Sequence, residues 1–345
     1  MSPKQRKILS FLFITLSVVA VFCIAFANEE LSDAWSALRH LDTHWLLVLL
    51  GCWAAYGFFD ALGAWFCLRR QGFRLKLRTV IGITLLGFFY SNVTPGATGG
   101  QPMQVNSMHK EGVPIANGTT VVTIRLIANQ FMVSLLSLLF MLFNRAFLTK
   151  QLYGAVWFVV IGWVINFAVV PLVLLAAFKP KWLEKLAFGL LRLLAKLHLV
   201  KDLEKSREKA SAALDTYHTA MHTLLRSPGQ ILLQCLCSAV SLLALMSSIV
   251  FVYYAFGLSG RPWYLLLSLS FALFVSASYT PLPGASGAQE GGFMYYFRGI
   301  FPGGKTGLAL LIWRFFTYYL FLFVGVVFLL LQKLIRSSTK KDRSS

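Results

Sequence analysis

The sequence predicts an all-α integral membrane protein with six full transmembrane helices and two re-entrant helical hairpins in an inverted-topology repeat. Three observations predict this class: an apolar composition, six long apolar runs, and one seven-residue motif that occurs twice within apolar sequence. The chain has 345 residues, of which 57% are hydrophobic and 13% are charged. Soluble domains are about half apolar and about a quarter charged, so the composition excludes an ordinary soluble globule.

The six apolar runs are each long enough to cross a bilayer, which takes about 20 residues in a helix. They lie at residues 8–27, 45–67, 118–143, 152–178, 229–256 and 304–331. The first run follows the basic stretch KQRK and ends in small residues, as a cleaved signal peptide does. Its length is that of a membrane span, so we expect a retained first helix.

Two further apolar regions, 79–117 and 263–302, are interrupted near the middle by proline and glycine. The interruptions are PGATGGQ at Pro95–Gln101 and PGASGAQ at Pro283–Gln289. If each region crossed the bilayer once, the basic segment 179–228 would lie outside, against the positive-inside rule. If each region is a hairpin that returns to its own side, this segment, both chain ends and the basic connection after the second span are all cytoplasmic. The charge distribution therefore favours two hairpins.

In this topology the first hairpin enters from the cytoplasm and the second enters from outside. Each is followed by a span that carries one arginine, Arg125 or Arg314, at nearly the same distance from the motif. Repeated sequence with opposite entry predicts an inverted repeat, which in transporters places the binding site near the bilayer midplane. The expected hairpin tips are Pro95, Gly96, Gly99, Gly100, Pro283, Gly284 and Gly287.

We expect one polytopic membrane domain over residues 1–336 and a disordered cytoplasmic tail over 337–345. The segment 179–228 has leucines at helical spacing among lysines, which predicts an amphipathic helix on the inner leaflet. His218 and His222 could share a helix face, but no glutamate of a zinc-protease motif accompanies them. The cysteines all lie within apolar runs, so we expect buried hydrophobic side chains. No metal or cofactor is expected.

Few ionisable residues lie within the apolar segments. They are Asp60, Arg125, Glu290 and Arg314. A charge at the bilayer centre costs at least about 2.5–3.5 kcal/mol, so each requires a partner or water. In one interpretation the arginines bind a lipid phosphate while Glu290 holds a cationic headgroup; in the other, Arg–Glu and Arg–Asp pairs lock the helices together. Other polar residues expected in the same cavity are Gln101, Gln104, Gln289, Asn92 and Asn129.

Several function classes are not supported by the sequence. The net charge of +19 lies mainly between the apolar runs, as the orientation rule for membrane loops predicts, so nucleic-acid binding is not expected. The glycines of PGATGGQ lack the Lys-Ser/Thr of a nucleotide-binding loop. We find no motif of a hydrolase or metalloprotease and assign no catalytic residue.

The two motifs with their flanking residues resemble the lysylphosphatidylglycerol synthase transmembrane family, over residues 8–332. This family is the flippase-like domain of multiple peptide resistance factors and their stand-alone relatives. The similar segments are NVTPGATGGQPMQV (Asn92–Val105) and KEGVP (Lys110–Pro114) before Arg125, and TPLPGASGAQE (Thr280–Glu290) before Arg314. Other branches of the family continue with a Glu-x-x-Arg motif, which Gln101–Gln104 lacks, so phosphate contacts made there in relatives are not carried over.

The resemblance implies two hairpins between two half-bundles in a bacterial cell membrane, with both termini cytoplasmic. It also implies movement of an aminoacylated phosphatidylglycerol or another phospholipid between leaflets, associated with resistance to cationic antimicrobial peptides. The sequence ends at Ser345, soon after the last span, so we expect the acyltransferase domain of full-length relatives to be absent. The alternatives are a phosphatidylglycerol lysyltransferase, an accessory subunit for a separately encoded lipid-modifying enzyme, and a homo-oligomeric form of any of these.

Overall fold

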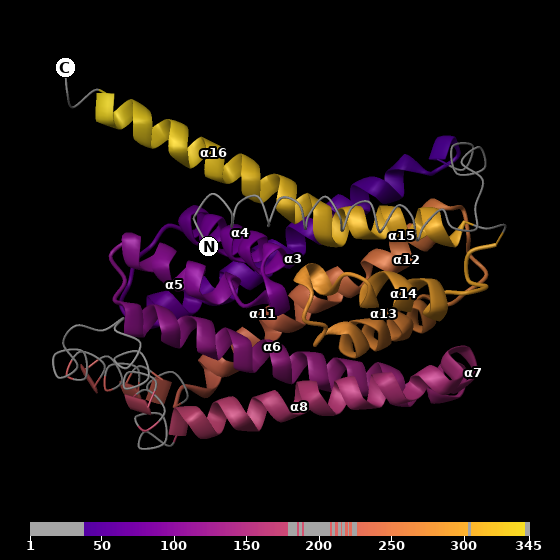
Figure 1. Ribbon diagram of the computed structural model, residues 1–345, viewed down its shortest axis with the longest axis horizontal. Helices are drawn as coiled ribbons and strands as arrows, with labels where there is room; N and C mark the ends of the chain where they lie inside the picture. Colours follow the sequence, from indigo (N-terminus) through magenta and orange to yellow (C-terminus); the bar gives the residue numbers. More distant parts are fainter. Residues whose placement is uncertain are drawn as a thin grey trace.

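The computed structural model describes residues 38–178, 226–302 and 305–341, together with isolated positions between 179 and 225. Within these residues all regular structure is helical (Figure 1). Five helical segments are long and apolar enough to cross a membrane: Thr43–Arg70, Ile115–Phe143, Arg145–Leu174, Pro228–Ala255 and Thr306–Leu331. They agree with five of the predicted spans. The predicted first span, 8–27, and most of segment 179–228 lie outside the described residues.

The long helices carry apolar side chains on their outer surfaces. On α8, Trp157, Phe158 and Ile161 are all more than half exposed. A soluble protein rarely exposes an apolar surface of this extent, whereas lipid accommodates it without cost. The helices that form these segments are α3 (Thr43–Arg70), α6 (Ile115–Phe143), α7 (Arg145–Leu152), α8 (Val156–Phe178), α11 (Pro228–Met246), α12 (Ser248–Ala255), α15 (Thr306–Arg314) and α16 (Leu320–Lys341).

Each copy of the repeated motif is the turn of a helical hairpin. In the first hairpin, α4 (Leu77–Val93) and α5 (Gly100–Lys110) flank a 3₁₀ turn at Pro95–Ala97 and pack against each other. In the second hairpin, α13 (Trp263–Ala277) and α14 (Ala288–Tyr296) flank a 3₁₀ turn at Pro283–Ala285 and also pack together.

The two turns have nearly the same backbone conformation. Gly96 has φ 58° and ψ 24°, and Gly284 has φ 61° and ψ 18°. Both values lie in the left-handed region, which glycine occupies without steric cost. The conformations then diverge, because Gly99 has φ −80° whereas its counterpart Gly287 has φ 88°. The two copies of the motif therefore share their backbone conformation only up to Ala97 in the first turn and Ala285 in the second.

The hairpins approach each other from opposite ends of the bundle. In Figure 1, α5 lies toward the left end and α14 toward the right, while α6 runs between the two ends. The turns meet between them, where Gly96 N donates a hydrogen bond of 3.2 Å to Pro281 O. Opposite approach agrees with the predicted inverted repeat. Re-entrant insertion into a bilayer stays a prediction.

The connections for which the sequence predicted a cytoplasmic location lie at one end of the bundle. The α5–α6 connection, the C-terminal end of α8 and the C-terminal end of α16 all lie at the left in Figure 1. The connection after α3 belongs to the same end, because Asn117 at the start of α6 donates a 2.8 Å hydrogen bond to Gln71. Arg70 likewise donates to Ser227 before α11. The placement of this end in the cytoplasm stays a prediction.

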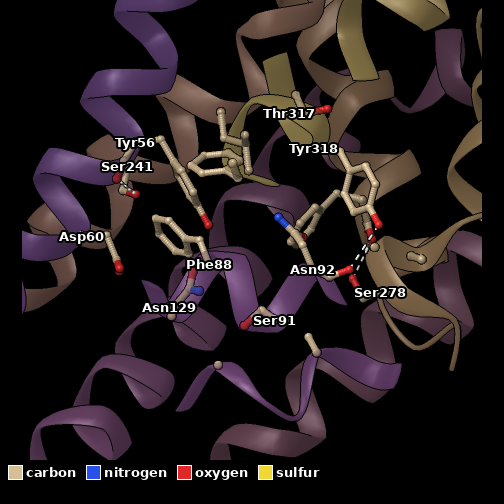
Figure 2. A pocket seen from close by; sticks show the side chains of 18 of the residues that line it. Tyr56, Asp60, Phe88, Ser91, Asn92, Asn129, Ser241, Ser278, Thr317 and Tyr318 are labelled. Carbon is tan, nitrogen blue, oxygen red and sulfur yellow. Dashed lines mark hydrogen bonds between the residues drawn. The ribbon is translucent and has the colours of Figure 1, made fainter. Parts of the chain in front are cut away.

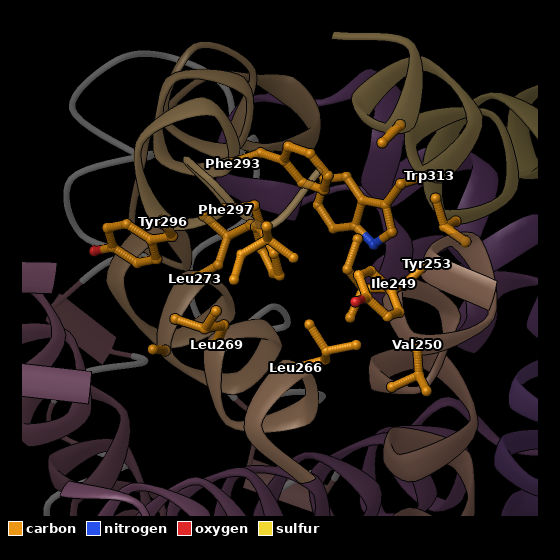
Figure 3. Packing of buried hydrophobic residues seen from close by; sticks show 14 of the residues in the cluster. Ile249, Val250, Tyr253, Leu266, Leu269, Leu273, Phe293, Tyr296, Phe297 and Trp313 are labelled. Carbon is orange, nitrogen blue, oxygen red and sulfur yellow. The ribbon is translucent and has the colours of Figure 1, made fainter. Parts of the chain in front are cut away.

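The second hairpin packs on a core of aromatic and aliphatic side chains (Figure 3). Phe293 stacks on Phe297 with ring centroids 4.7 Å apart and lies 5.2 Å from the ring of Trp313. Leu266 and Leu269 on α13 are fully buried in the same cluster. Because Trp313 is fixed in this core, the next residue along α15, Arg314, is held beside the hairpin.

The last helix extends into the predicted C-terminal tail. Helix α16 continues to Lys341, so residues 337–341, for which the sequence predicted disorder, are helical. Each residue added to an existing helix gains a hydrogen bond without a new nucleation cost.

Candidate functional site

A cavity of about 540 Å³ lies between the turns of the two hairpins (Figure 2). We call it the central cavity. Its wall includes Gly96 and Ala97 of the first turn and Gly284 and Ala285 of the second. The other wall residues come from α3, α4, α5, α6, α8, α11, α13, α14, α15, α16, the segment between α13 and the second turn, and the segment that joins α15 to α16. Ligand pockets have volumes of about 300–1,000 Å³, so the central cavity could hold a small ligand or a lipid headgroup.

The wall of the central cavity combines charged, amide and hydroxyl groups with apolar side chains. Figure 2 shows Asp60 on α3 and Ser91 and Asn92 on α4 around this space, and Tyr56 stacks on Phe88 with ring centroids 4.7 Å apart. Backbone and polar side chains at membrane depth are tolerated where they line a wet cavity. The polar wall residues include Tyr56, Asp60, Ser91, Asn92, Gln101, Gln104, Arg125, Asn129, Gln130, Asn166, Ser238, Ser241, Tyr279, Gln289, Arg314, Thr317 and Tyr318.

Arg125 joins three helices on the side of the first hairpin. Its Nη2 donates to the carboxylate of Asp60 on α3, and its Nη1 donates to Gln104 Oε1 on α5 at 3.1 Å. Gln104 reaches this position because Gly87 on α4 has no side chain; a Cβ there would overlap the Gln104 amide. Arg125 is 8% exposed. The first hairpin is therefore attached to α3 and α6 through one guanidinium group.

Arg314 has a different set of partners on the side of the second hairpin. Its Nε donates to Glu290 Oε1 at 2.6 Å, and its Nη2 donates to the carbonyl oxygen of Gly284 at 3.0 Å. The second carboxylate oxygen of Glu290 accepts from Gly287 N at 2.6 Å, which caps α14. The guanidinium also lies 5.1 Å from the ring of Tyr318, within cation–π range. The turn, the start of α14 and α15 are thus tied together.

A second contact joins the hairpins near the cavity. Tyr318 donates a 3.1 Å hydrogen bond to Asn92 O at the end of α4, and its ring lies against Gly284 (Figure 2). Tyr318 lies in a π-helical turn at Phe315–Tyr319, between α15 and α16. Such turns are rare and occur frequently at functional sites.

The central cavity brings together most of the residues that the sequence predicted. Glu290 does not line the wall but lies behind Arg314, with an exposed fraction of 1%. Both arginines have a carboxylate partner, which is the internal network of the second interpretation. The predicted residues on the wall are Asp60, Asn92, Gln101, Gln104, Arg125, Asn129, Gln289, Arg314, Gly96, Gly100 and Gly284, whereas Pro95, Gly99, Pro283 and Gly287 shape the turns.

The sequence analysis missed a cluster of polar side chains on the cavity wall, formed by Gln130, Asn166 and Tyr279. Gln130 donates hydrogen bonds of 3.3 Å to both Asn166 on α8 and the hydroxyl of Tyr279. Amides within apolar runs were the available signal, since polar side chains inside membranes usually bond across helices. Tyr318 gave no such signal, because an aromatic residue in an apolar run is unremarkable.

No group of three or more His, Cys, Asp or Glu side chains that could hold a metal occurs among the described residues. The four cysteines in this part of the chain, Cys52, Cys67, Cys235 and Cys237, are free thiols.

These features define a polytopic all-α membrane protein in which two helical hairpins enclose a polar cavity with paired charges. The family described as lysylphosphatidylglycerol synthase TM region matches residues 8–325, and the chain belongs to this family. The chain is also similar to a UPF0104 membrane protein of Archaeoglobus fulgidus. The two are 25% identical over 327 residues, which cover 90% of this chain and 93% of that protein.

Proposed function

We propose that this chain is a flippase-like transporter that moves a phospholipid between the leaflets of a bacterial cell membrane. The headgroup passes through the central cavity, and the acyl chains stay in the surrounding lipid. The observation that carries this proposal is the central cavity itself. It lies between two oppositely directed hairpin turns, and Arg125 and Arg314 both line its wall. Arginine binds phosphate through parallel hydrogen bonds, so a guanidinium group on the cavity wall suits a phospholipid headgroup.

The paired charges suit a site that is empty for part of a transport cycle. A buried arginine without a partner would be costly, and Asp60 and Glu290 neutralise the two guanidinium groups. At a pair that stays accessible from the cavity, a lipid phosphate then competes with the carboxylate for the guanidinium, and an amine on the headgroup competes for the carboxylate. Exchange of partners keeps the local charge balanced while the headgroup enters and leaves.

The proposal includes an orientation and a cellular role. We place the end of the bundle that holds the connection after α3 in the cytoplasm, with both termini, because this connection carries Arg69, Arg70, Arg74 and Lys76. Family membership supports an aminoacylated phosphatidylglycerol as one substrate. Display of an amine-bearing lipid on the outer leaflet lowers the negative surface charge and so weakens binding of cationic antimicrobial peptides.

The proposal is tested with purified protein in vesicles that contain phosphatidylglycerol labelled on an acyl chain with a fluorophore. A reductant added outside quenches only the outer leaflet, so the extent of quenching reports movement between leaflets. The wild-type protein should allow nearly complete quenching, and Arg314→Ala and Glu290→Ala should reduce it to that of empty vesicles. Arg145→Ala removes an exposed charge on α7 and is the matched control. Normal movement by a well-folded variant that carries both the Arg314 and the Glu290 substitution would contradict the proposal.

A second candidate function is suggested by the family description, which contains the word synthase. In that case the chain would transfer lysine from lysyl-tRNA to phosphatidylglycerol, alone or with a separately encoded enzyme. Expression in a host without such a synthase, followed by lipid analysis, decides between the two. Lysyl-lipid made from this chain alone would replace the transport proposal, and co-purification of an enzyme would indicate an accessory role.

A further inference from the structure

The two arginine–carboxylate pairs of the central cavity differ in how completely their hydrogen bonds are satisfied. In the pair of Arg314 and Glu290, both carboxylate oxygens accept hydrogen bonds, and the guanidinium reaches both the carboxylate and the Gly284 carbonyl. The side chains are 5% and 1% exposed. A buried pair with this many partners holds the structure in place and has little capacity left for a ligand.

The pair of Arg125 and Asp60 retains unused hydrogen-bonding groups. Arg125 Nε is buried and has no hydrogen-bond partner within the described part of the chain. Asp60 binds the guanidinium through Oδ2, while its Oδ1 makes no hydrogen bond to the described residues. The Asp60 side chain is 17% exposed, against 1% for Glu290. A buried donor without a partner costs free energy in an empty site. A ligand that accepts from this donor and donates to the accessible acceptor beside it removes that cost.

Gln289 from the second hairpin adds a further unsatisfied acceptor to the cavity wall. Its Oε1 is buried without a partner among the described residues, and its exposed fraction is 9%. The unused groups of the wall are thus one cationic donor and two acceptors, of which one is anionic. A ligand that complements them offers an anionic oxygen and a protonated amine.

We propose that the Arg125–Asp60 pair is the headgroup subsite of the central cavity and selects a zwitterionic headgroup, with one phosphodiester and one primary ammonium. The Arg314–Glu290 pair is a positioning element that fixes the second hairpin turn. This inference rests on the proposed function and names its substrate class. The shared chemistry occurs in phosphatidylethanolamine and in phosphatidylglycerol esterified with an amino acid that has an uncharged side chain.

Charge balance explains the selectivity. A zwitterionic headgroup replaces each member of the ion pair by a group of the same sign, so neither Arg125 nor Asp60 is left with an uncompensated charge. Phosphatidylglycerol brings a phosphate alone, so it occupies the arginine and leaves the carboxylate unpaired in a partly buried site. A lysyl ester brings a second ammonium group, for which the subsite has no second carboxylate.

The test compares four lipids with the wild-type protein and with Asp60→Asn. The lipids are phosphatidylglycerol, phosphatidylethanolamine, alanyl-phosphatidylglycerol and lysyl-phosphatidylglycerol. Binding is measured by native mass spectrometry of the detergent-solubilised protein, and movement by the vesicle assay with acyl-labelled forms. Asp60→Asn conserves shape and removes one negative charge. Glu111→Gln makes the same change at an exposed position after α5 and is the matched control.

The wild-type protein and Glu111→Gln should bind the two zwitterionic lipids about tenfold more tightly than phosphatidylglycerol, a preference of the size that one charge-assisted hydrogen bond provides. Asp60→Asn should lose this preference and favour phosphatidylglycerol. Glu290→Gln should slow movement of all four lipids equally, since it affects the turn and not the headgroup. If phosphatidylethanolamine and the alanyl ester bind with equal affinity, the protein recognises the chemistry that the two headgroups share. If one binds more tightly, that lipid is the source of the headgroup.

The outcomes separate this inference from the transport proposal. Equal affinity of the wild-type protein for zwitterionic and anionic lipids overturns the inference, even if Asp60→Asn does not fold, and leaves transport standing. Selective binding without movement supports the subsite and contradicts transport. If the wild-type protein neither binds nor moves any of the four lipids, both are overturned.

Discussion

At the residue scale, a charged side chain buried in the membrane interior is stable only when a partner of opposite charge lies beside it. Glu290 and Arg314 are 1% and 4% exposed, and the hydrogen bonds of Glu290 also hold Gly287 at the start of α14. Removing one member of a buried pair costs more than the pair contributes, because the remaining charge stays buried. The local stability of the second hairpin should therefore respond strongly to a change in one charge.

Glu290→Gln should lower the free energy of unfolding by about 3–5 kcal/mol, because Arg314 would keep its charge without a counter-ion. Thermal unfolding of the detergent-solubilised protein measures the effect. Glu111→Gln, at an exposed site, should shift the midpoint little. Equal midpoints for the two variants would show that Glu290 does not hold Arg314 by charge.

The two turn glycines allow backbone strain to be separated from steric overlap. Gly96 and Gly284 have nearly the same left-handed conformation, so alanine at either costs about 1–2 kcal/mol in the backbone. Only at Gly284 would the new Cβ overlap another side chain, the ring of Tyr318; near Gly96 the nearest neighbour is Thr98 at 3.9 Å. Gly284→Ala should therefore destabilise the protein more than Gly96→Ala. The same unfolding midpoint for both would contradict the packing of Tyr318 on the second turn.

At the element scale, the hairpins depend on close approach of their arms. A Cβ on Gly100 of α5 would overlap Ser91 Oγ and lie 2.6 Å from the Gly87 carbonyl oxygen of α4. The equivalent position in the second hairpin is Ala288, so the second pair of arms accommodates a methyl group there. Small residues let helix backbones approach in a membrane, where packing replaces the hydrophobic effect as the force between helices.

Gly100→Ala should separate α4 from α5 and destabilise the protein by about 1–3 kcal/mol, the usual cost of overpacking. It should also lower lipid movement, because Gln104 and therefore Arg125 would lose their positions. Gly51→Ala is the matched control, since nothing lies within 4 Å of a Cβ at Gly51 on α3. Unfolding midpoints and the vesicle assay measure both effects. A wild-type midpoint for Gly100→Ala would contradict the close packing of the first hairpin.

At the scale of the whole molecule, the two ends of the bundle should lie on opposite sides of the membrane. Arg74 follows α3 at the end that we place in the cytoplasm, and Ser259 precedes α13 at the other end. Both residues are exposed. The positive-inside rule assigns the side, and the packing of the helices assigns which connections share it.

Single cysteines at these positions, in a background without the native cysteines, test the topology. A thiol reagent that cannot cross membranes should label Ser259→Cys in intact cells and should label Arg74→Cys only after permeabilisation. The opposite pattern would invert the orientation. Labelling of both positions from outside would contradict the hairpins, because an additional crossing would then lie between the two positions.

The sequence by itself determined the class of the protein and the positions at which its helices break. Apolar length, basic connections and left-handed glycines depend on local sequence, so five described spans and both turns fall where they were predicted. Family membership was also predicted from the two motifs and is confirmed. The helical continuation to Lys341 was not predicted. The polar composition of residues 337–345 was interpreted by itself, without the preceding helix, which can continue into them.

Only the tertiary structure decided the partners of the charged residues. Asp60 and Arg125 lie on helices far apart in sequence, and Gln104 reaches them through the space beside Gly87. The sequence showed that Pro102 and Glu290 break the symmetry of the motifs, and the structure showed the consequence: α14 supplies its own carboxylate, whereas the first hairpin receives one from α3. Hydrophobic patterns are local properties of a chain, but the partner of a buried charge is set by how separate helices pack.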